Sequence, residues 1–324
     1  MKKYILISTK LDWRDISWER PRESGEVTYF QTLPYEGNVI MKHLVRFFYS
    51  WKINVKGIRV PFRSLCYKGI LKAFHINQGD EVKIIFYDRS RASYDFELLN
   101  YFRKHIPGVK IGYLFSDIAA KSGANAFGIV EKLNENYDKV FSFDLKDSQK
   151  YNFDYSYLIY DRDISGIDRS VNSDAFLVAR AKDRLEDLLS VFDLCVQNGL
   201  ETDFAINGIS KEQLYMLGNR DIQTNEDIPY KEVVERLNHS KCIVDIMQKG
   251  SVGITLNIVE AVVFNIKAIS NNTELVNEPF YDPSRILILT EGVVDLKAFI
   301  DMPMKPYTEE DRRIFSGTNL FERL

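Results

Sequence analysis

Short apolar runs alternate with amphipathic segments along most of this sequence, and this alternation constrains the fold more than any other feature. In the first half, runs rich in β-branched and aromatic residues occupy positions 81–86, 109–115 and 139–143. Strands that alternate with helices form parallel sheets, because the chain must cross over between strands of the same direction. The runs are followed by three acids, Asp88, Asp117 and Asp144. We expect these acids along the carboxyl edge of a sheet, where open α/β sheets bind ligands.

The alternation stops and then begins again. Residues 152–172 carry mixed charge without periodicity, which is typical of a link between domains. Further strands are expected at 174–179, 201–206, 241–246, 266–269 and 285–289. A chain of 324 residues is long enough for two domains. The sequence therefore predicts two Rossmann-like α/β domains, residues 1–165 and 166–306, followed by a helical tail at 307–324.

Residues 248–272 contain two glycines, Gly250 and Gly253, then an apolar helix and a short strand. Between positions 251 and 265 the only charged residue is Glu260. A buried carboxylate is rarely left without a partner, so Glu260 should contact a protein group or a ligand. A glycine loop before a helix N-terminus is a common phosphate site, because free N–H groups point there. The alternative is an ordinary loop–helix–strand unit whose acid pairs with a neighbouring lysine.

The remaining composition fits an intracellular globular protein. The three cysteines are scattered in apolar surroundings, and neither their number nor their spacing suggests a disulfide framework or a metal site. No apolar stretch approaches the roughly 20 residues that a membrane span requires, and the apolar run at the N-terminus is too short for a signal peptide. We therefore expect a cytoplasmic protein.

Residues 37–79 contain eight lysines and arginines and no acid, although the whole chain has a net charge of −3. Aromatic residues are interleaved with these cations. Such a segment suits an anionic membrane face or a phosphate-bearing acceptor, with Lys52, Arg59 and Arg63 as candidate contacts. Binding of nucleic acid is a weaker reading. A solvated face, neutralised by acids from elsewhere in the fold, is the structural alternative.

Two stretches resemble a known family. They are VFSFDLKD at 140–147 with Tyr151, and LNHSKCIVD at 237–245 leading into GITL at 253–256 and Glu260. These stretches look like GT-B glycosyltransferases of bacterial capsule, exopolysaccharide and lipopolysaccharide synthesis. The resemblance covers the C-terminal half well and the N-terminal half in topology. It implies two domains facing across a cleft, an acceptor in the first, a nucleotide-sugar donor in the second, and a tail helix that packs back toward the first.

The resemblance also implies roles for single residues. Enzymes of this kind need neither metal nor cofactor, so cations must stabilise the leaving diphosphate. Arg180 and Lys182, directly after the first strand of the second domain, are the candidates; a surface basic cluster is the alternative. Ribose would contact Glu260. The other donor-binding candidates are Asn207, Gly208, Gly250, Ser251, Gly253 and Thr255. Asp161 and Asp163 have the spacing of a metal-binding acid pair, but they lie in the link.

An inverting transferase also needs a base that deprotonates the acceptor. Asp117 is the first choice because of its place at the sheet edge. The other candidates are Asp12, Glu26 and Asp88. A retaining transferase needs no such base. The competing interpretation of the chain is an epimerase-like or non-catalytic nucleotide-binding α/β protein.

Overall fold

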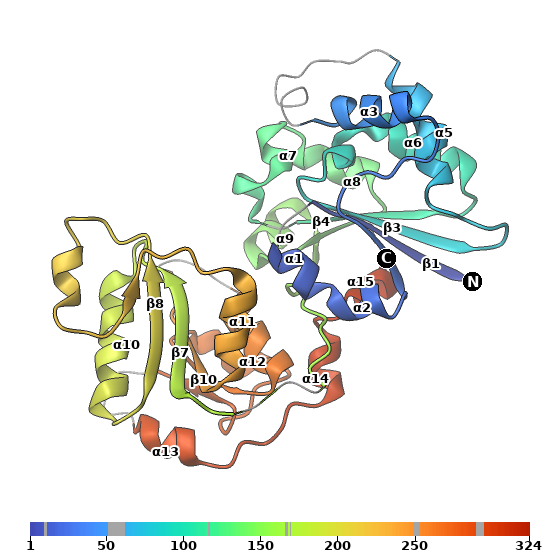
Figure 1. The fold of residues 1–324 in the computed structure, drawn as a ribbon. Helices are drawn as coiled ribbons and strands as arrows, with labels where there is room; N and C mark the ends of the chain where they lie inside the picture. The colour runs from blue at the N-terminus through green and yellow to red at the C-terminus, as the bar shows by residue number, and fades with distance from the viewer. Residues whose placement is uncertain are drawn as a thin grey trace. The chain divides into compact units, whose positions relative to one another are not determined.

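The computed structural model describes residues 1–9, 12–50, 62–115, 117–165, 168, 170–248, 253–289 and 295–324, with backbone alone at 12–14. It divides into two compact units (Figure 1). The first unit comprises Met1–Ile159 and Ser316–Leu324, and the second comprises Tyr160–Phe315. The boundary between the units thus lies a few residues earlier than the expected 165/166.

The first unit is built on a six-stranded parallel sheet of order β2-β1-β3-β4-β5-β6. The strands are β1 Lys2–Ile7, β2 Val27–Phe30, β3 Glu81–Tyr87, β4 Lys110–Leu114, β5 Lys139–Ser142 and β6 Asp154–Tyr155. The strands expected from apolar runs are present. Two edge strands, β2 and β6, lie instead in residues 9–35 and 152–172, whose polar pattern without periodicity predicts irregular structure. An edge strand buries less of its surface than a central one, so it needs no apolar run to form.

Helices cover both faces of this sheet. They are α1 Asp12–Ser17, α2 Glu19–Glu23, α3 Val39–Phe48, α5 Tyr67–Lys72, α6 Phe96–His105, α7 Gly123–Ala126, α8 Leu133–Asn136, α9 Leu145–Tyr151 and α15 Gly317–Arg323. Helices α3, α5 and α6 pack on one face, and α15 packs on the other (Figure 1). The pattern of residues 124–136 predicts a single helix, and this prediction is wrong, because the chain turns at Gly128 with a φ of +64°.

The second unit contains a six-stranded parallel sheet of order β12-β11-β10-β7-β8-β9. Its strands are β7 Ser173–Arg180, β8 Thr202–Asn207, β9 Gln223–Thr224, β10 Ser240–Asp245, β11 Lys267–Ser270 and β12 Ile286–Ile288. Its helices are α10 Leu185–Gln197, α11 Tyr230–Asn238, α12 Leu256–Phe264, α13 Leu296–Asp301 and α14 Glu309–Arg313. Short 3-10 turns complete the two units: η1 Arg63–Cys66, η2 Arg91–Tyr94, η3 Ala119–Lys121, η4 Val130–Lys132, η5 Leu214–Leu217 and η6 Thr273–Asn277.

The tail is divided between the units, which differs from the single segment expected at 307–324. Helix α14 belongs to the second unit, where Asp311 accepts a hydrogen bond from the buried Arg285 at 3.1 Å. Helix α15 belongs to the first unit, where the ring of Phe321 stacks on Tyr4 with centroids 5.0 Å apart. Only the last nine residues therefore return to the first unit.

Each sheet has one point where the strand order reverses. In the first sheet this switch point lies between β1 and β3, as in flavodoxin-like folds. In the second it lies between β7 and β10, as in the order of dinucleotide-binding folds. Open α/β sheets bind ligands outside the carboxyl ends of the strands at such points. The two edges are therefore the first places to look for a site.

Candidate functional sites

The switch point of the second unit carries two unpaired cations. Strand β7 ends at Arg180, and Lys182 follows in the loop. Both side chains are exposed, and over the described residues no ion pair holds either of them. Lys182 has a φ of +45°, in the left-handed region. Non-glycine residues held in that region cluster at ligand sites. The sequence placed both cations correctly at the carboxyl edge.

A third cation, Arg184, connects two loops at this edge. Its guanidinium Nη1 donates to the carbonyl of Ile246, and its Nε donates to the carbonyl of Arg180 at 3.3 Å. Burial lowers the pKa of Arg184, an effect that the nearby Asp245 opposes. Arg184 thus joins the loop after β7 to the loop after β10, across the switch point. Sequence reasoning missed this role, because nothing in the local pattern separates a structural arginine from its exposed neighbours.

The next strand contributes a polar group without a partner. Asn207 ends β8 and lies opposite Arg180 in the strand register. Its side-chain oxygen is buried and has no hydrogen-bond partner within the described ranges. Gly208 follows with a φ of +75°, a conformation that glycine adopts without strain. Asn207 therefore offers an unsatisfied acceptor close to the two exposed cations.

A buried acid holds the beginning of α12 in place. Asp245, at the end of β10, accepts hydrogen bonds from the hydroxyls of Thr255 at 2.8 Å and Ser270 at 2.9 Å. Burial raises the pKa of Asp245. Because Thr255 gives its hydroxyl proton to Asp245 and also caps α12, that proton is already used within the protein. The carbonyl of Gly253 accepts a hydrogen bond from Asn272 at 3.1 Å, whereas Gly250 and Ser251 lie outside the described residues.

Glu260 lies in the second turn of α12 and is 2% exposed. Its carboxylate accepts a hydrogen bond from the hydroxyl of Tyr230, which lies 3.1 Å from the hydroxyl of Tyr160. Burial raises the pKa of Glu260 to about 7. The acid therefore has a protein partner, a tyrosine rather than a lysine, and its burial does not by itself require a ligand. Contact with a ribose stays a prediction.

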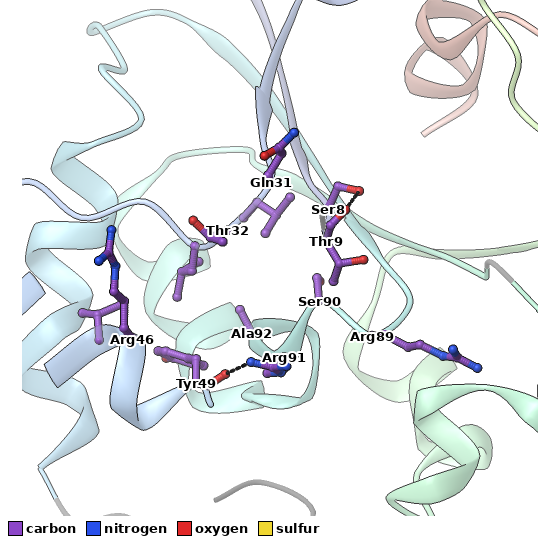
Figure 2. Close-up of a pocket in the computed structure, with 13 residues that line it drawn as sticks. Ser8, Thr9, Gln31, Thr32, Arg46, Tyr49, Arg89, Ser90, Arg91 and Ala92 are labelled. Atoms are coloured by element: carbon purple, nitrogen blue, oxygen red, sulfur yellow. Dashed lines mark hydrogen bonds between the residues drawn. The ribbon is translucent and has the colours of Figure 1, made fainter. Parts of the chain in front are cut away.

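The switch point of the first unit contains a cavity of about 560 Å³, shown in Figure 2. The wall is formed by the ends of β1 and β3, the segment after β2, and the last turns of α3. The lining residues are Ile7, Ser8, Thr9, Gln31, Thr32, Leu33, Val45, Arg46, Tyr49, Arg89, Ser90, Arg91 and Ala92. The polar side chains among the described lining residues are cations, hydroxyls and the amide of Gln31, and none of these residues is an acid. This cavity could not be predicted from the sequence, because its wall combines segments that lie far apart along the chain.

The acids at this edge have different environments. Asp88 is fully buried and accepts hydrogen bonds from Tyr94, Tyr113 and the backbone N–H of Gly123. It is therefore a structural group, and its candidacy as a base was wrong. Asp117 is 42% exposed and lies 3.8 Å from Arg89.

The other acids named as bases differ again. Glu26 accepts a hydrogen bond from Thr318 at 2.7 Å. The side chain of Asp12 lies outside the described residues. Asp144 caps α9 by accepting a hydrogen bond from the backbone N–H of Asp147 at 2.8 Å. Among the acids that follow the central strands, Asp88 is buried, whereas Asp117 and Asp144 are both partly exposed.

The candidate contacts of the basic segment are only partly described. Lys52 and Arg59 fall outside the described residues. Arg63 is 18% exposed, lies 3.6 Å from Asp95, and stacks over the ring of Tyr49. Its guanidinium thus stabilises the fold, which corrects its assignment to a free basic surface. Asp95 also accepts hydrogen bonds from Tyr49 and Tyr67.

Comparisons with known proteins support the fold. No family model matches the sequence, and no curated protein sequence matches it. The glycosyltransferase AviGT4 of avilamycin A biosynthesis is similar in structure, with a TM-score of 0.50 and 10% identity over 99% of this chain and 95% of that chain. OtsA gives a TM-score of 0.48 at 10% identity, covering 99% and 97%. Sucrose-phosphate synthase from Thermosynechococcus elongatus gives 0.47 at 11% identity, covering 100% and 94%. The two six-stranded parallel sheets and the likeness to AviGT4 confirm the expected α/β fold class of the GT-B type.

Proposed function

We propose that this protein is a glycosyltransferase that binds a nucleotide-sugar donor at the carboxyl edge of the second unit. The observation that carries the proposal is the pair of exposed cations, Arg180 and Lys182, beside the switch point of a Rossmann-type sheet. The fold shared with AviGT4 supports it. Among cytoplasmic small molecules, a nucleoside diphosphate sugar combines the groups that such an edge recognises: a diphosphate, a ribose and a sugar.

The proposed reaction is a displacement at the anomeric carbon of the donor. An acceptor oxygen forms a bond to that carbon, the bond from the carbon to the diphosphate breaks, and the leaving nucleoside diphosphate keeps the electron pair. Negative charge then grows on the diphosphate, and cations fixed beside it stabilise the transition state. Arg180 and Lys182 would supply this charge, so the proposal requires neither a metal ion nor a cofactor.

Other groups at the same edge would position the donor. The unpartnered oxygen of Asn207 can accept a hydrogen bond from a sugar or base, and Gly208 allows close approach of the backbone. Backbone N–H groups of Gly250, Ser251 and Gly253 would contact the diphosphate. Tyr230 contacts one carboxylate oxygen of Glu260, so a ribose would contact the other oxygen. If configuration is inverted, Asp117 is our candidate to take the acceptor proton.

We propose a saccharide or lipid-linked acceptor, used in the synthesis of a surface polysaccharide. Support comes from the resemblance of the sequence and from α3, which exposes Val39, Ile40 and Phe47 together with the cations Lys42 and Arg46. A helix that exposes apolar and basic side chains together suits the surface of an anionic membrane. In the described part of the chain, no helix is long and apolar enough to cross a membrane. We propose that attachment at the inner face of the membrane is peripheral. We expect no nucleic acid partner.

Donor turnover tests this function. The protein is incubated with UDP-, GDP- and dTDP-sugars and with a CMP-sugar, and release of nucleotide is followed by chromatography. We expect one donor to be consumed, and Arg180→Ala to lower its turnover about 100-fold. Lys297→Ala is the matched control, because Lys297 is an exposed cation of α13 whose ion pair with Asp301 lies on the surface. Interconversion of two nucleotide sugars without release would indicate an epimerase instead. An unchanged rate in Arg180→Ala would remove the assignment.

A further inference from the structure

The cavity of the first unit (Figure 2) has the chemistry of an anion site. It lies at the switch point between β1 and β3, and its volume of about 560 Å³ suits a small ligand. Its described lining residues include three arginines and no aspartate or glutamate. A bound anion would therefore meet no like charge among the described residues of the cavity wall.

Ser90 is the most informative group in this lining. It is 3% exposed, and its hydroxyl has no hydrogen-bond partner among the residues described. Ser90 precedes the 3-10 turn η2, yet its side chain does not cap that turn. A buried hydroxyl without a partner loses its hydrogen bonds to water and gains nothing in return. A ligand in the cavity that accepts a hydrogen bond would satisfy it.

Two of the arginines are available to a ligand. Arg46 is exposed on the last turns of α3, and in the described parts of the chain no acid pairs with it. Arg91 donates a hydrogen bond to the backbone carbonyl of Tyr49 at 3.3 Å. Like Arg46, it has no ion pair with any described residue. Arg89 differs, because it lies near Asp88 and Asp117 and its side chain extends away from the other lining residues in Figure 2. Guanidinium groups bind phosphate oxygens in a bidentate manner, which suits them to this task.

The positive lining continues into an adjoining hollow of about 520 Å³. The two share Gln31, Thr32, Leu33, Val45 and Arg46. The adjoining hollow adds Arg22 and Lys42, and no acid occurs among the lining residues that the structure describes there. Arg46 lies in the wall that the two hollows share, so an anion bound to it would be accessible from both hollows. The ligand can therefore be larger than the charged group alone.

We propose that this cavity binds a phosphate ester, with Arg46 and Arg91 contacting the phosphate oxygens and the Ser90 hydroxyl donating a third hydrogen bond. The ester can belong to a soluble metabolite or to a lipid headgroup. Binding itself is independent of glycosyl transfer. If the ester is the acceptor, that part of the inference rests on the proposed function.

The soluble source is tested by calorimetric titration of the full-length protein with sn-glycerol 3-phosphate at constant ionic strength. Glycerol is the neutral control. We expect saturable binding of the phosphate ester alone, weakened at least tenfold in Arg46→Ala and about tenfold in Ser90→Ala. Ser90→Ala should leave thermal stability unchanged or slightly raised, because it removes a hydroxyl that has no partner. Lys104→Ala, which removes an exposed cation of α6 outside the cavity, should bind as the parent does.

The lipid source is tested with vesicles of phosphatidylcholine, with and without phosphatidic acid. A lipid ligand predicts binding to the acidic vesicles that falls in Ser90→Ala, a variant that leaves the charge of the protein unchanged. Binding that falls only in variants that remove a charge would reflect general surface attraction and would overturn the cavity as the lipid site. If the soluble ester binds saturably but Ser90→Ala binds the acidic vesicles as the parent does, the site is assigned to a soluble ligand.

The proposal is overturned if neither probe binds, or if Arg46→Ala and Ser90→Ala bind the phosphate ester as tightly as the parent. A failure of this proposal can be distinguished from a failure of the proposed glycosyltransferase function. Nucleoside diphosphates should stabilise Arg46→Ala as much as the parent, since Arg46 belongs to the first unit. A protein that binds the ester but no nucleotide would keep this site and lose the glycosyltransferase assignment.

Discussion

The carboxyl edges of the two sheets both contain a buried aspartate, but they differ in the polar groups that have no partner. Each is fastened by a buried aspartate, Asp88 in the first unit and Asp245 in the second, which accepts hydrogen bonds from the elements around it. The first edge then encloses a cavity that contains the unpartnered hydroxyl of Ser90. The second presents Arg180 at the end of β7 and Lys182 in the loop after it, both exposed. In each unit a buried acid holds the edge together, and the donors left without partners are our candidate ligand contacts.

The largest expected effect concerns the two fastening acids. Asp88→Ala leaves two tyrosine hydroxyls and the N–H of Gly123 without their acceptor, so we expect a loss of about 4 kcal/mol in the free energy of unfolding. Asp245→Ala should cost about 2 kcal/mol, because burial already disfavours its ionised form and only two hydroxyls lose their acceptor.

Urea unfolding can separate the two effects. All three tryptophans lie in the part of the sequence that forms the first unit, so fluorescence follows that unit, and circular dichroism follows both. Asp187→Ala, on the exposed side of α10, is the control. A loss below 1 kcal/mol in Asp88→Ala would contradict the role of this acid and the parallel between the edges.

Glu260 should make the stability of the second unit depend on pH. Its pKa rises from 4.5 to about 7 on folding. Between these values the folded protein holds a proton that the unfolded chain has released, so stability falls as the pH rises through this window. The full fall is about 3 kcal/mol, present below pH 4.5 and lost above pH 7. Glu260→Gln cannot ionise, so its stability should lack this fall. Parallel curves of unfolding free energy against pH for the two proteins would contradict the assignment.

The same variant tests the ligand role of Glu260. Alanine is unsuitable here because it leaves Tyr230 without its acceptor and creates a cavity. Glutamine keeps the shape and an acceptor oxygen. If a nucleotide stabilises Glu260→Gln less than the parent at pH 8, the carboxylate contacts the ribose. Equal stabilisation would restrict Glu260 to its contact with Tyr230.

The smallest expected effect concerns the basic segment. Reversing the charges of Lys52 and Arg59 should weaken association with anionic vesicles at least about 30-fold, since each cation near such a surface contributes about 1 kcal/mol. Reversal of Lys104 and Lys132, two exposed cations outside that segment, changes the net charge equally and serves as the control. Equal partitioning of the first variant and the parent, measured by vesicle sedimentation, would exclude a membrane role for these residues.

The central strands could be predicted from the sequence because each buries a continuous apolar run. The edge strands β2 and β6 could not, since they bury too little surface to require one. The places of Arg180, Lys182 and Asn207 followed from strand ends alone. The cavity could not be predicted, because Ser90 becomes informative only when its lack of a partner is visible. Glu260 was noticed for its isolation in the sequence, but Tyr230, its partner, lies thirty residues away in another helix.

Thermal stabilisation by nucleotides shows whether the second unit holds a donor. The melting temperature of the parent and of Arg180→Ala is determined with UDP, GDP, dTDP and CMP at concentrations far above micromolar, because a ligand that binds only the folded state raises it by mass action. We expect at least one nucleotide to raise the melting temperature of the parent and to raise that of Arg180→Ala less. No shift with any nucleotide, or equal shifts in both proteins, would contradict a donor site at the carboxyl edge of the second unit.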